Sequence, residues 1–278
     1  MKMRQIKSTI QGQRAIDGAG VHLVRVFSKR ETADFDPFLM LDSFDSKNPN
    51  DYLAGFPMHP HRGIETITYL IEGEIEHKDS LGNKDTIRAG ESQWMTAGNG
   101  ILHQEMPLAS KHMLGFQLWL NLPAEKKMSD PLYLSITQKM IGHVKKDTAD
   151  IRVISGSYGE VCGVTPNHIP ATIYDIALKK DSTITLQTKP EETVFVFLMQ
   201  GSAIINDRKI AEKTAVLFGE GEEITLLSTP DEALRFIFFS GKPLKEPIAW
   251  GGPIVMNTQE ELRQAFDELE NGTFIKHR

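Results

Sequence analysis

The chain has 278 residues and a formal net charge of -6 at pH 7, and 40% of its residues are hydrophobic and 24% are charged. This composition is typical of a folded globular protein, and it excludes disordered, collagen-like and low-complexity chains. The length suits roughly two domains, each large enough to bury a core of its own.

The sequence also narrows where the protein works and what it contacts. No apolar run approaches the ~18 residues of a membrane-spanning helix, and the first residues lack the apolar stretch of a secretory signal. We therefore expect a cytoplasmic protein without membrane contact. Basic pairs such as Lys126-Lys127 and Lys145-Lys146 are scattered, which disfavours direct nucleic-acid binding. The single cysteine, Cys162, has no partner for an internal disulfide, so folding needs no oxidising compartment.

Short apolar runs dominate the chain from its beginning to about residue 240. They are rich in Val, Ile, Phe and Thr and are bounded by turn residues, a pattern that predicts many short strands and an all-β fold. The clearest runs are 21–27, 65–70, 115–120, 173–178, 193–199, 214–218 and 234–239. Hairpin turns are predicted at Ser80-Leu81-Gly82-Asn83 and at Asn206-Asp207, because these residue types favour tight turns.

The two halves of the chain resemble each other. A strand-like run ends in Gly73 in the first half and in Gly201 in the second, and each is followed by a strand, a tight turn and another strand. Such an internal repeat predicts a duplicated β-barrel. The predicted parts are a first barrel at residues 1–125, a connection at 126–149, a second barrel at 150–245 and a tail with a helix at 246–278.

The end of the chain has a different character. Thr258 and Glu261 form a capping-box pattern, in which each side chain bonds to the backbone of the other residue at the start of a helix. Apolar residues then recur at helical spacing at Leu262, Ala265, Phe266 and Leu269. They predict an amphipathic helix from about 259 to 270, with its apolar face on one of the barrels or on a partner.

Two pairs of residues carry the chemistry of metal binding: His59 with His61, and His103 with Glu105. In each pair the residues are two apart, so both side chains of a pair point to the same face of a strand. A lone His-x-His pattern is often a surface coincidence, but two such pairs on adjacent barrel strands would converge. Three imidazoles and one carboxylate are a ligand set for Fe, Ni, Cu or Zn, with open positions on an octahedral ion.

The segments around these residues resemble a known family. Residues 55–73 and 90–103 are similar to the two cupin motifs, with His-x-His in the first and a glycine-rich turn before one histidine in the second. The match is closer to the pirin family, a two-barrel branch of the cupins. It rests on the segments 38–42, 58–66, 103–106, 116–123 and 252–258, which are spread over nearly the whole chain. The resemblance implies a bicupin fold.

The resemblance also implies one divalent metal in the first barrel, held by His59, His61, His103 and Glu105. Fe(II) is the expected metal, and Ni, Cu, Zn or Mn are alternatives. Many cupins have a further carboxylate ligand after the His-x-His pattern, but Thr66 occupies that position here and Glu65 precedes it. We therefore expect Glu65 to support the ligands or line the pocket rather than to bind the metal.

The second barrel is expected to hold no metal. The family resemblance implies that this barrel binds no metal, and the residues themselves support the same expectation. When Gly201 is aligned with Gly73, Gln187 and Lys189 stand at the positions of the His-x-His pair. Neither residue type is a usual ligand for these metals.

The leading functional hypothesis is a metal-dependent dioxygenase. The pirin resemblance narrows the substrate to flavonols such as quercetin, with dioxygen as the second reactant. Glu105 would then be a metal ligand and also the base for a substrate hydroxyl. The alternative is a non-enzymatic regulatory protein that binds other proteins and senses metal or redox state. A zinc hydrolase is least favoured, because four protein ligands leave little room for an activated water at tetrahedral zinc.

Overall fold

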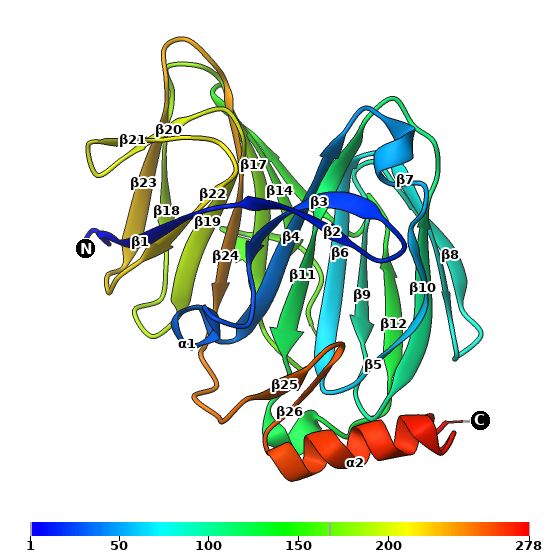
Figure 1. The fold of residues 1–278 in the computed structure, drawn as a ribbon. Helices are drawn as coiled ribbons and strands as arrows, with labels where there is room; N and C mark the ends of the chain where they lie inside the picture. Colours follow the sequence, from blue (N-terminus) through cyan, green and yellow to red (C-terminus); the bar gives the residue numbers. More distant parts are fainter. Residues whose placement is uncertain (1, 167, 278) are drawn as a thin grey trace. The chain divides into compact units, whose positions relative to one another are not determined.

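The structure is a computed structural model that describes residues 2–166 and 168–277. Most of the chain forms β-strands, as Figure 1 shows, so the predicted all-β class is confirmed. The chain divides into two compact units. The first barrel, as we call it, comprises Arg14–Thr32, Phe38–Gln138 and the chain from Leu244 onward. The second barrel comprises the chain up to Gln13 together with Ala33–Pro37 and Lys139–Pro243.

The first barrel is built from two antiparallel sheets. The larger sheet has the order β12 (Leu132–Ile136), β9 (Ser92–Thr96), β6 (Ile64–Glu72), β11 (Met113–Asn121), β4 (Phe38–Ser46), β3 (Val21–Phe27) and β2 (Gln13–Asp17). The smaller sheet has the order β5 (Phe56–His61), β10 (Ile101–Pro107), β7 (Glu74–Asp79) and β8 (Lys84–Arg88).

The second barrel repeats this architecture. Its larger sheet has the order β1 (Ile6–Gln11), β22 (Thr214–Phe218), β19 (Thr193–Gln200), β24 (Leu234–Gly241), β17 (Thr172–Leu178), β14 (Ala149–Ser155) and β13 (Gly142–Lys145). Its smaller sheet has the order β18 (Thr183–Gln187), β23 (Glu223–Ser228), β20 (Ala203–Ile205) and β21 (Arg208–Ile210). The matching orders agree with the repeat predicted from the sequence.

The strand pair β18 and β23 stands in the second barrel where β5 and β10 stand in the first. Its inward positions are Ile184 and Leu186 on β18 and Ile224 and Leu226 on β23, and all four belong to one buried hydrophobic core. The corresponding faces of the first barrel carry histidine and glutamate. The two barrels therefore share strand order but differ in what their interiors can bind.

The boundaries of the compact units differ from the predicted domain boundaries, most clearly at the two ends of the chain. β1 pairs with β22, from Ile6 opposite Phe218 to Gln11 opposite Thr214, so the first strand of the chain completes the second barrel. The chain from Leu244 onward packs with the first barrel instead of forming a separate tail. An alternating strand pattern shows that a segment forms a strand, but it does not identify the sheet edge that accepts its hydrogen bonds.

Local predictions from the sequence are confirmed. Each of the seven predicted runs lies in a strand, and the turns at 80–83 and 206–207 join β7 to β8 and β20 to β21. Asn206 and Asp207 both have positive φ, of 45° and 60°, as a two-residue hairpin of this kind requires. The helix α2 (Gln259–Glu270) begins at Thr258 with the predicted capping box.

The helix α2 packs within the first barrel. Its buried residues Leu262 and Ala265 lie in a hydrophobic cluster with β25 (Ala249–Gly251) and β26 (Ile254–Met256). The remaining elements are short: α1 (Thr32–Phe35), η1 (Pro49–Asp51), η2 (Ala124–Lys126), β15 (Ser157–Tyr158) and β16 (Val161–Cys162). Of the helices in the described residues, none is long and apolar enough to cross a membrane.

Candidate metal centre

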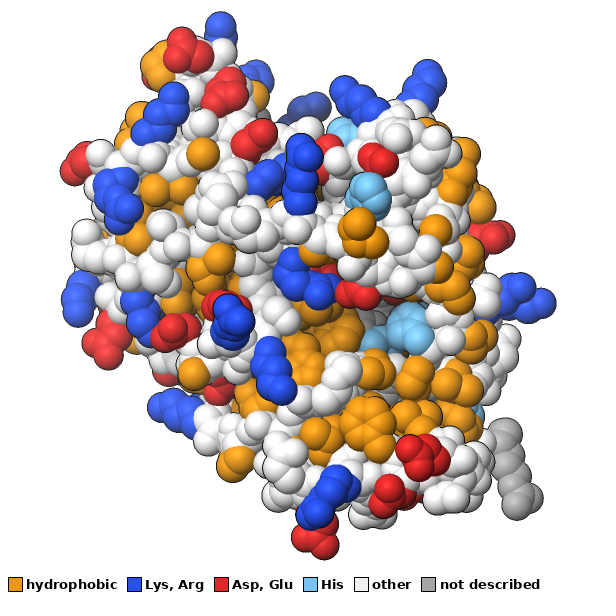
Figure 2. Space-filling model, viewed as in Figure 1, with side chains coloured by type: hydrophobic (Ala, Val, Ile, Leu, Met, Phe, Trp, Pro, Cys, Tyr) orange, Lys and Arg blue, Asp and Glu red, His pale blue; other side chains and the backbone are white. Residues whose placement is uncertain are grey.

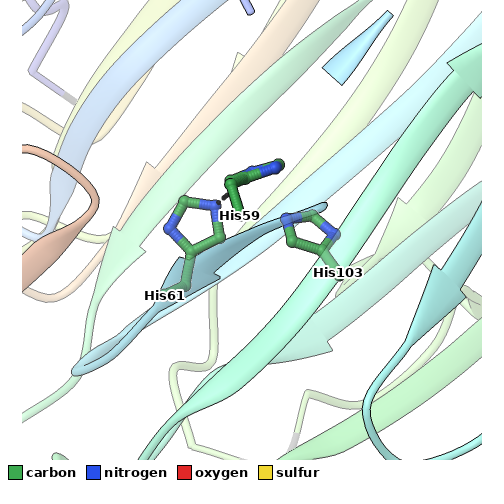
Figure 3. Close-up of side chains that lie close together, drawn as sticks. All are labelled: His59, His61 and His103. Atoms are coloured by element: carbon green, nitrogen blue, oxygen red, sulfur yellow. Dashed lines mark hydrogen bonds between the residues drawn. The ribbon is translucent and has the colours of Figure 1, made fainter. Parts of the chain in front are cut away.

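Two adjacent strands of the first barrel bring three histidines together. His59 and His61 lie on β5 and His103 lies on β10, and the antiparallel register places His103 opposite His59. Because side chains alternate along a strand, His59 and His61 share one face of β5. Figure 3 shows the three rings turned toward one another. One ligand nitrogen from each ring lies within 4.8 Å of those of the other two.

The hydrogen bonds of His59 and His61 leave a lone pair free on each ring. The Nδ1 atom of His59 lies 2.9 Å from the carbonyl oxygen of Pro57, and Nδ1 of His61 lies 3.0 Å from that of Pro253. A carbonyl oxygen only accepts hydrogen bonds, so each Nδ1 carries the proton and donates it. The two Nε2 atoms, which face each other at 3.1 Å, are therefore unprotonated in the neutral rings.

His103 is fully buried, and neither of its ring nitrogens has a hydrogen-bond partner within the described residues. Burial lowers the pKa of His103 well below its ordinary value, and the neighbouring histidines lower it further. Burial, followed by the charge of His59, lowers the pKa of His61 to about 3. Both rings are therefore neutral at pH 7, the protonation state that metal ligation requires.

These three histidines fit a transition-metal ion. A buried nitrogen without a partner costs ~1–3 kcal/mol, and two facing lone pairs add repulsion. A cation among the rings would remove both costs, and imidazole is a common ligand of Fe, Ni, Cu and Zn. The carbonyl partners of His59 and His61 match the outer hydrogen bonds that metal-bound histidines normally make.

Glu105 lies on the same face of β10 as His103, but it is not part of the cluster of ligand atoms that the three histidines form, and its carboxylate is held by three donors. Oε1 accepts hydrogen bonds from Thr68 Oγ1 at 2.8 Å and from Gln93 Nε2 at 2.6 Å. Oε2 accepts one from Gln117 Nε2 at 2.6 Å. With two donors on Oε1 and one on Oε2, the latter oxygen keeps a lone pair for a further partner.

Glu65 is fully buried on β6 and bonds to the neighbouring strand. Its carboxylate oxygens accept hydrogen bonds from Trp94 Nε1 at 3.0 Å and from Thr96 Oγ1 at 2.8 Å. Burial raises the pKa of Glu65 to about 7, although both hydrogen bonds act to lower it. These two hydrogen bonds connect Glu65 with β9 and not with the histidines, so a supporting role for it stays a prediction.

A cavity of about 720 Å³ opens beside the histidines. His59, His61 and Gln117 form part of its wall, and the rest includes apolar and charged side chains: Met40, Phe56, Trp119, Trp250, Asp17, Arg25, Lys29 and Asp42. Figure 2 shows pale blue histidine side chains at a hollow bordered by hydrophobic side chains. Cavities of this size and lining are typical of sites for small organic molecules.

Sequence reasoning missed several residues that shape this site. Gln93, Gln117 and Thr68 hold Glu105, and the carbonyl oxygen of Pro253 orients His61. Gln117 lies in the predicted run 115–120 and Gln93 lies in β9. Residue type alone does not show that the amide of either side chain points inward. A carbonyl partner has no signature in the sequence at all, because every residue has one.

Comparison with known sequences identifies the family. A sequence profile described as Pirin matches residues 20–120, and one described as Pirin C-terminal cupin domain matches residues 173–275. A pirin-like protein from Caulobacter vibrioides is 38% identical over 278 residues, which is 99% of this chain and 100% of that protein. The profiles cover both barrels and the relative covers the full length.

Solved structures agree with the sequence comparison. The crystal structure of a quercetin 2,3-dioxygenase from Acinetobacter baumannii has a TM-score of 0.90 and 33% identity, and 98% of each chain is covered. That of a bacterial pirin from Escherichia coli in complex with nickel(II) has a TM-score of 0.66 and 22% identity, covering 85% of this chain and 98% of that one. On this evidence the chain belongs to the pirin family and consists of two cupin domains.

Proposed function

We propose that this protein is a metal-dependent dioxygenase that acts on flavonols such as quercetin. One observation carries the proposal: three imidazoles converge, and two of them, His59 and His61, form part of the wall of a cavity large enough for a flavonol. The similarity to the Acinetobacter quercetin 2,3-dioxygenase over almost the full chain adds independent support.

The proposed metal is held by His59, His61 and His103, with Glu105 as a fourth ligand through Oε2. Three observations support this set: the free lone pairs on the histidines, the shared face of His103 and Glu105, and the open lone pair on Oε2. We propose Fe(II), with Ni, Cu, Zn and Mn as the alternatives to be compared. When bound, such an ion supplies Lewis acidity and, for the redox-active metals, electron transfer to dioxygen.

The cavity walls would orient a planar substrate. The rings of Trp119 and Trp250 lie with their centroids 5.8 Å apart and 32° from coplanar, and Phe56 and Met40 add apolar surface. Flat aromatic faces of this kind bury a polyphenol ring and keep water out. Gln117, Arg25 and Lys29 add polar groups to this wall. Arg25 already bonds to Asp17 and Asp42 and Lys29 to the Trp250 carbonyl, so only their remaining N–H groups can bind substrate hydroxyls.

We propose that Glu105 also accepts the proton of the substrate hydroxyl. Its Oε1 is saturated by Thr68 and Gln93, so Oε2 is the oxygen left to receive a proton. Gln117, which donates to Oε2, is itself part of the cavity wall, so one amide group connects this carboxylate oxygen with the space for substrate.

Oxygen consumption with quercetin tests the proposal. Metal-free protein is loaded separately with Fe(II), Ni(II), Cu(II), Zn(II) and Mn(II), and oxygen uptake is followed with increasing quercetin. At least one metal should give a rate that saturates with substrate. His59→Ala and Glu105→Gln should lower that rate by several orders of magnitude. His143→Ala should not, because this histidine is exposed and pairs with Asp150 in the second barrel.

Flavonols oxidise slowly in air, and free iron accelerates this. The control is therefore the His59→Ala variant mixed with the same metal salt, measured at equal total protein and equal total metal. Uptake no faster than this control with every metal would overturn the enzymatic proposal. It would favour the regulatory alternative, in which the metal serves as a sensor.

A further inference from the structure

The segment from Ala249 to Phe274 reaches the metal-site strand from the far end of the sequence. Pro253, in the turn between β25 and β26, accepts the hydrogen bond of His61 Nδ1 across 192 residues of sequence. That bond determines which nitrogen of His61 carries the proton, and hence leaves Nε2 free. The last part of the chain therefore sets the tautomer and orientation of His61, a proposed metal ligand of the first barrel.

The backbone after His61 is tied to the same segment. The amide of Val255 donates to the carbonyl oxygen of Arg62 at 3.1 Å. Next to it, Gly63 has a φ of +77°, and a Cβ atom there would lie 2.0 Å from the carbonyl oxygen of Val255. Only glycine allows the two backbones to come this close. The contact between β26 and the end of β5 is therefore a direct backbone contact that depends on glycine at position 63.

A buried lysine strengthens this junction. Nζ of Lys127 donates to the carbonyl oxygens of Gly63 and Val255, each at 2.9 Å, and to Oδ1 of Asn121 at 2.7 Å. Three acceptors use all three protons of an ammonium group. Lys127 therefore joins the turn after β5 to β26 directly.

Arg62 links its own strand to the helix and to the end of the chain. Its side chain is buried, and Nη2 donates to Oε2 of Glu268 on α2 at 2.7 Å and to the carbonyl oxygen of Phe274 at 2.9 Å. The guanidinium group also lies 4.2 Å from the centroid of the Phe274 ring. One side chain directly after a proposed ligand thus holds both α2 and the segment that follows it.

Arg62 also reaches the strand of the third histidine. Its Nε atom donates to the carbonyl oxygen of Asn99 at 2.7 Å, in the turn that leads into β10 and His103. In the same turn, a Cβ atom on Gly100 would lie 2.9 Å from the carbonyl oxygen of Phe274. Both histidine strands are therefore anchored by Arg62 and Phe274.

We propose that the segment Ala249–Phe274 is a positioning element of the metal site, and that its docking on Arg62 is thermodynamically coupled to metal binding. The inference rests on the metal site of the proposed function, but not on the substrate. Because Trp250 and Pro253 also line the cavity, undocking would remove both the hydrogen-bond partner of His61 and part of the cavity wall. Coupling between two sites is reciprocal, so metal must also stabilise the docked segment.

The test compares Arg62→Met with Lys276→Met. Lys276 pairs with the same Glu268 oxygen at 2.9 Å but is partly exposed and is not among the partners of Arg62, so it is a matched control for loss of an ion pair on α2. Ni(II) affinity is measured by competition with a chromophoric chelator, and the ligand geometry by electron paramagnetic resonance of Cu(II)-loaded protein. Arg62→Met should bind Ni(II) ~10–100-fold more weakly with an altered Cu(II) spectrum. Lys276→Met should match the wild type in both, and Arg62→Lys should lie between.

Hydrogen exchange of the unmodified protein provides the reciprocal measurement and is independent of whether Arg62→Met folds. Addition of Ni(II) should slow amide exchange in Ala249–Phe274, and leave β18 and β23 of the second barrel unchanged. Unaltered exchange in that segment, or equal Ni(II) affinity of Arg62→Met and the wild type, would overturn the coupling while the metal site stands. A wild-type protein that binds none of the metals would overturn the metal site and the coupling together.

Discussion

Nε2 of His59 and Nε2 of His61 face each other at 3.1 Å, and the Nδ1 atom behind each points at a backbone carbonyl oxygen. Both rings are thus held with their lone pairs directed at one point before any metal is bound. Such a site needs little rearrangement on binding, which favours affinity because ordering costs are already met by the fold. The predictions below follow from this arrangement and from the groups around it.

Gln93 should affect turnover without holding the metal. Its Nε2 atom donates to Glu105, which only accepts, so this bond fixes the direction of the amide; the Tyr133 hydroxyl lies 3.1 Å from Oε1 of Gln93 and 2.9 Å from Oδ2 of Asp85 and shares one proton between them. Gln93→Leu removes the donor and should lower kcat for quercetin by ~10–100-fold, with one metal per chain retained. Tyr133→Phe keeps the donor and should have a smaller effect. Equal kcat in Gln93→Leu and the wild type would show that this amide does not position Glu105.

Glu65 should make stability depend on pH. Its pKa is about 7 in the folded protein against an ordinary value of 4.5. Below pH 4.5 the carboxyl group is protonated in both folded and unfolded states, so its stabilising contribution is fully present. Between pH 4.5 and 7 only the unfolded state releases the proton, and the free energy of unfolding falls by up to ~1.4 kcal/mol per pH unit. Above pH 7 this loss stays constant.

Glu65→Gln removes the titration and retains a polar group for Trp94 and Thr96. The variant and the wild type should therefore be similarly stable at pH 4.5, and the variant more stable at pH 8, as urea unfolding would measure. A difference that does not change with pH would contradict the raised pKa. Metal content should be unaffected, whereas complete loss of metal would make Glu65 a ligand.

Gly63 and Gly82 form a matched pair for testing the junction of β5 with β26. Both have positive φ, of +77° and +90°, but a Cβ atom on Gly82 meets nothing within 4 Å, whereas one on Gly63 meets the Val255 carbonyl. Gly82→Ala should cost about 1–2 kcal/mol of backbone strain and leave Ni(II) affinity intact. Gly63→Ala adds about 1–3 kcal/mol of overpacking and should weaken Ni(II) binding. Similar melting temperatures and affinities in the two variants would contradict the close approach.

The sequence identifies the candidate ligands because their signal is local. Two residues two apart on one strand share a face, and a glycine turn before His103 marks the start of the neighbouring strand. The capping box of α2 and the hairpin at Asn206-Asp207 are local in the same sense, and the structure confirms both.

Contacts between residues far apart in the sequence could not be predicted in this way. β1 and the segment after Leu244 each join a barrel through backbone hydrogen bonds and packing with residues roughly 200 positions away, and nothing in their own residue types selects that partner. The same holds for the three donors around Glu105, because Gln93, Gln117 and Thr68 meet only through the pairing of separate strands. Tertiary pairing, rather than local propensity, decides these contacts.

Anomalous diffraction from crystals of the metal-loaded protein tests the central claim most directly, because it locates the ion independently of activity. Data collected above and below the absorption edge of the bound metal should give one peak per chain in the first barrel, at ~2.1 Å from a nitrogen of each of His59, His61 and His103. A carboxylate oxygen of Glu105 at similar distance would establish the fourth ligand. A peak elsewhere, for instance at the pair of His112 and Asp45, with none among the three histidines, would contradict the account.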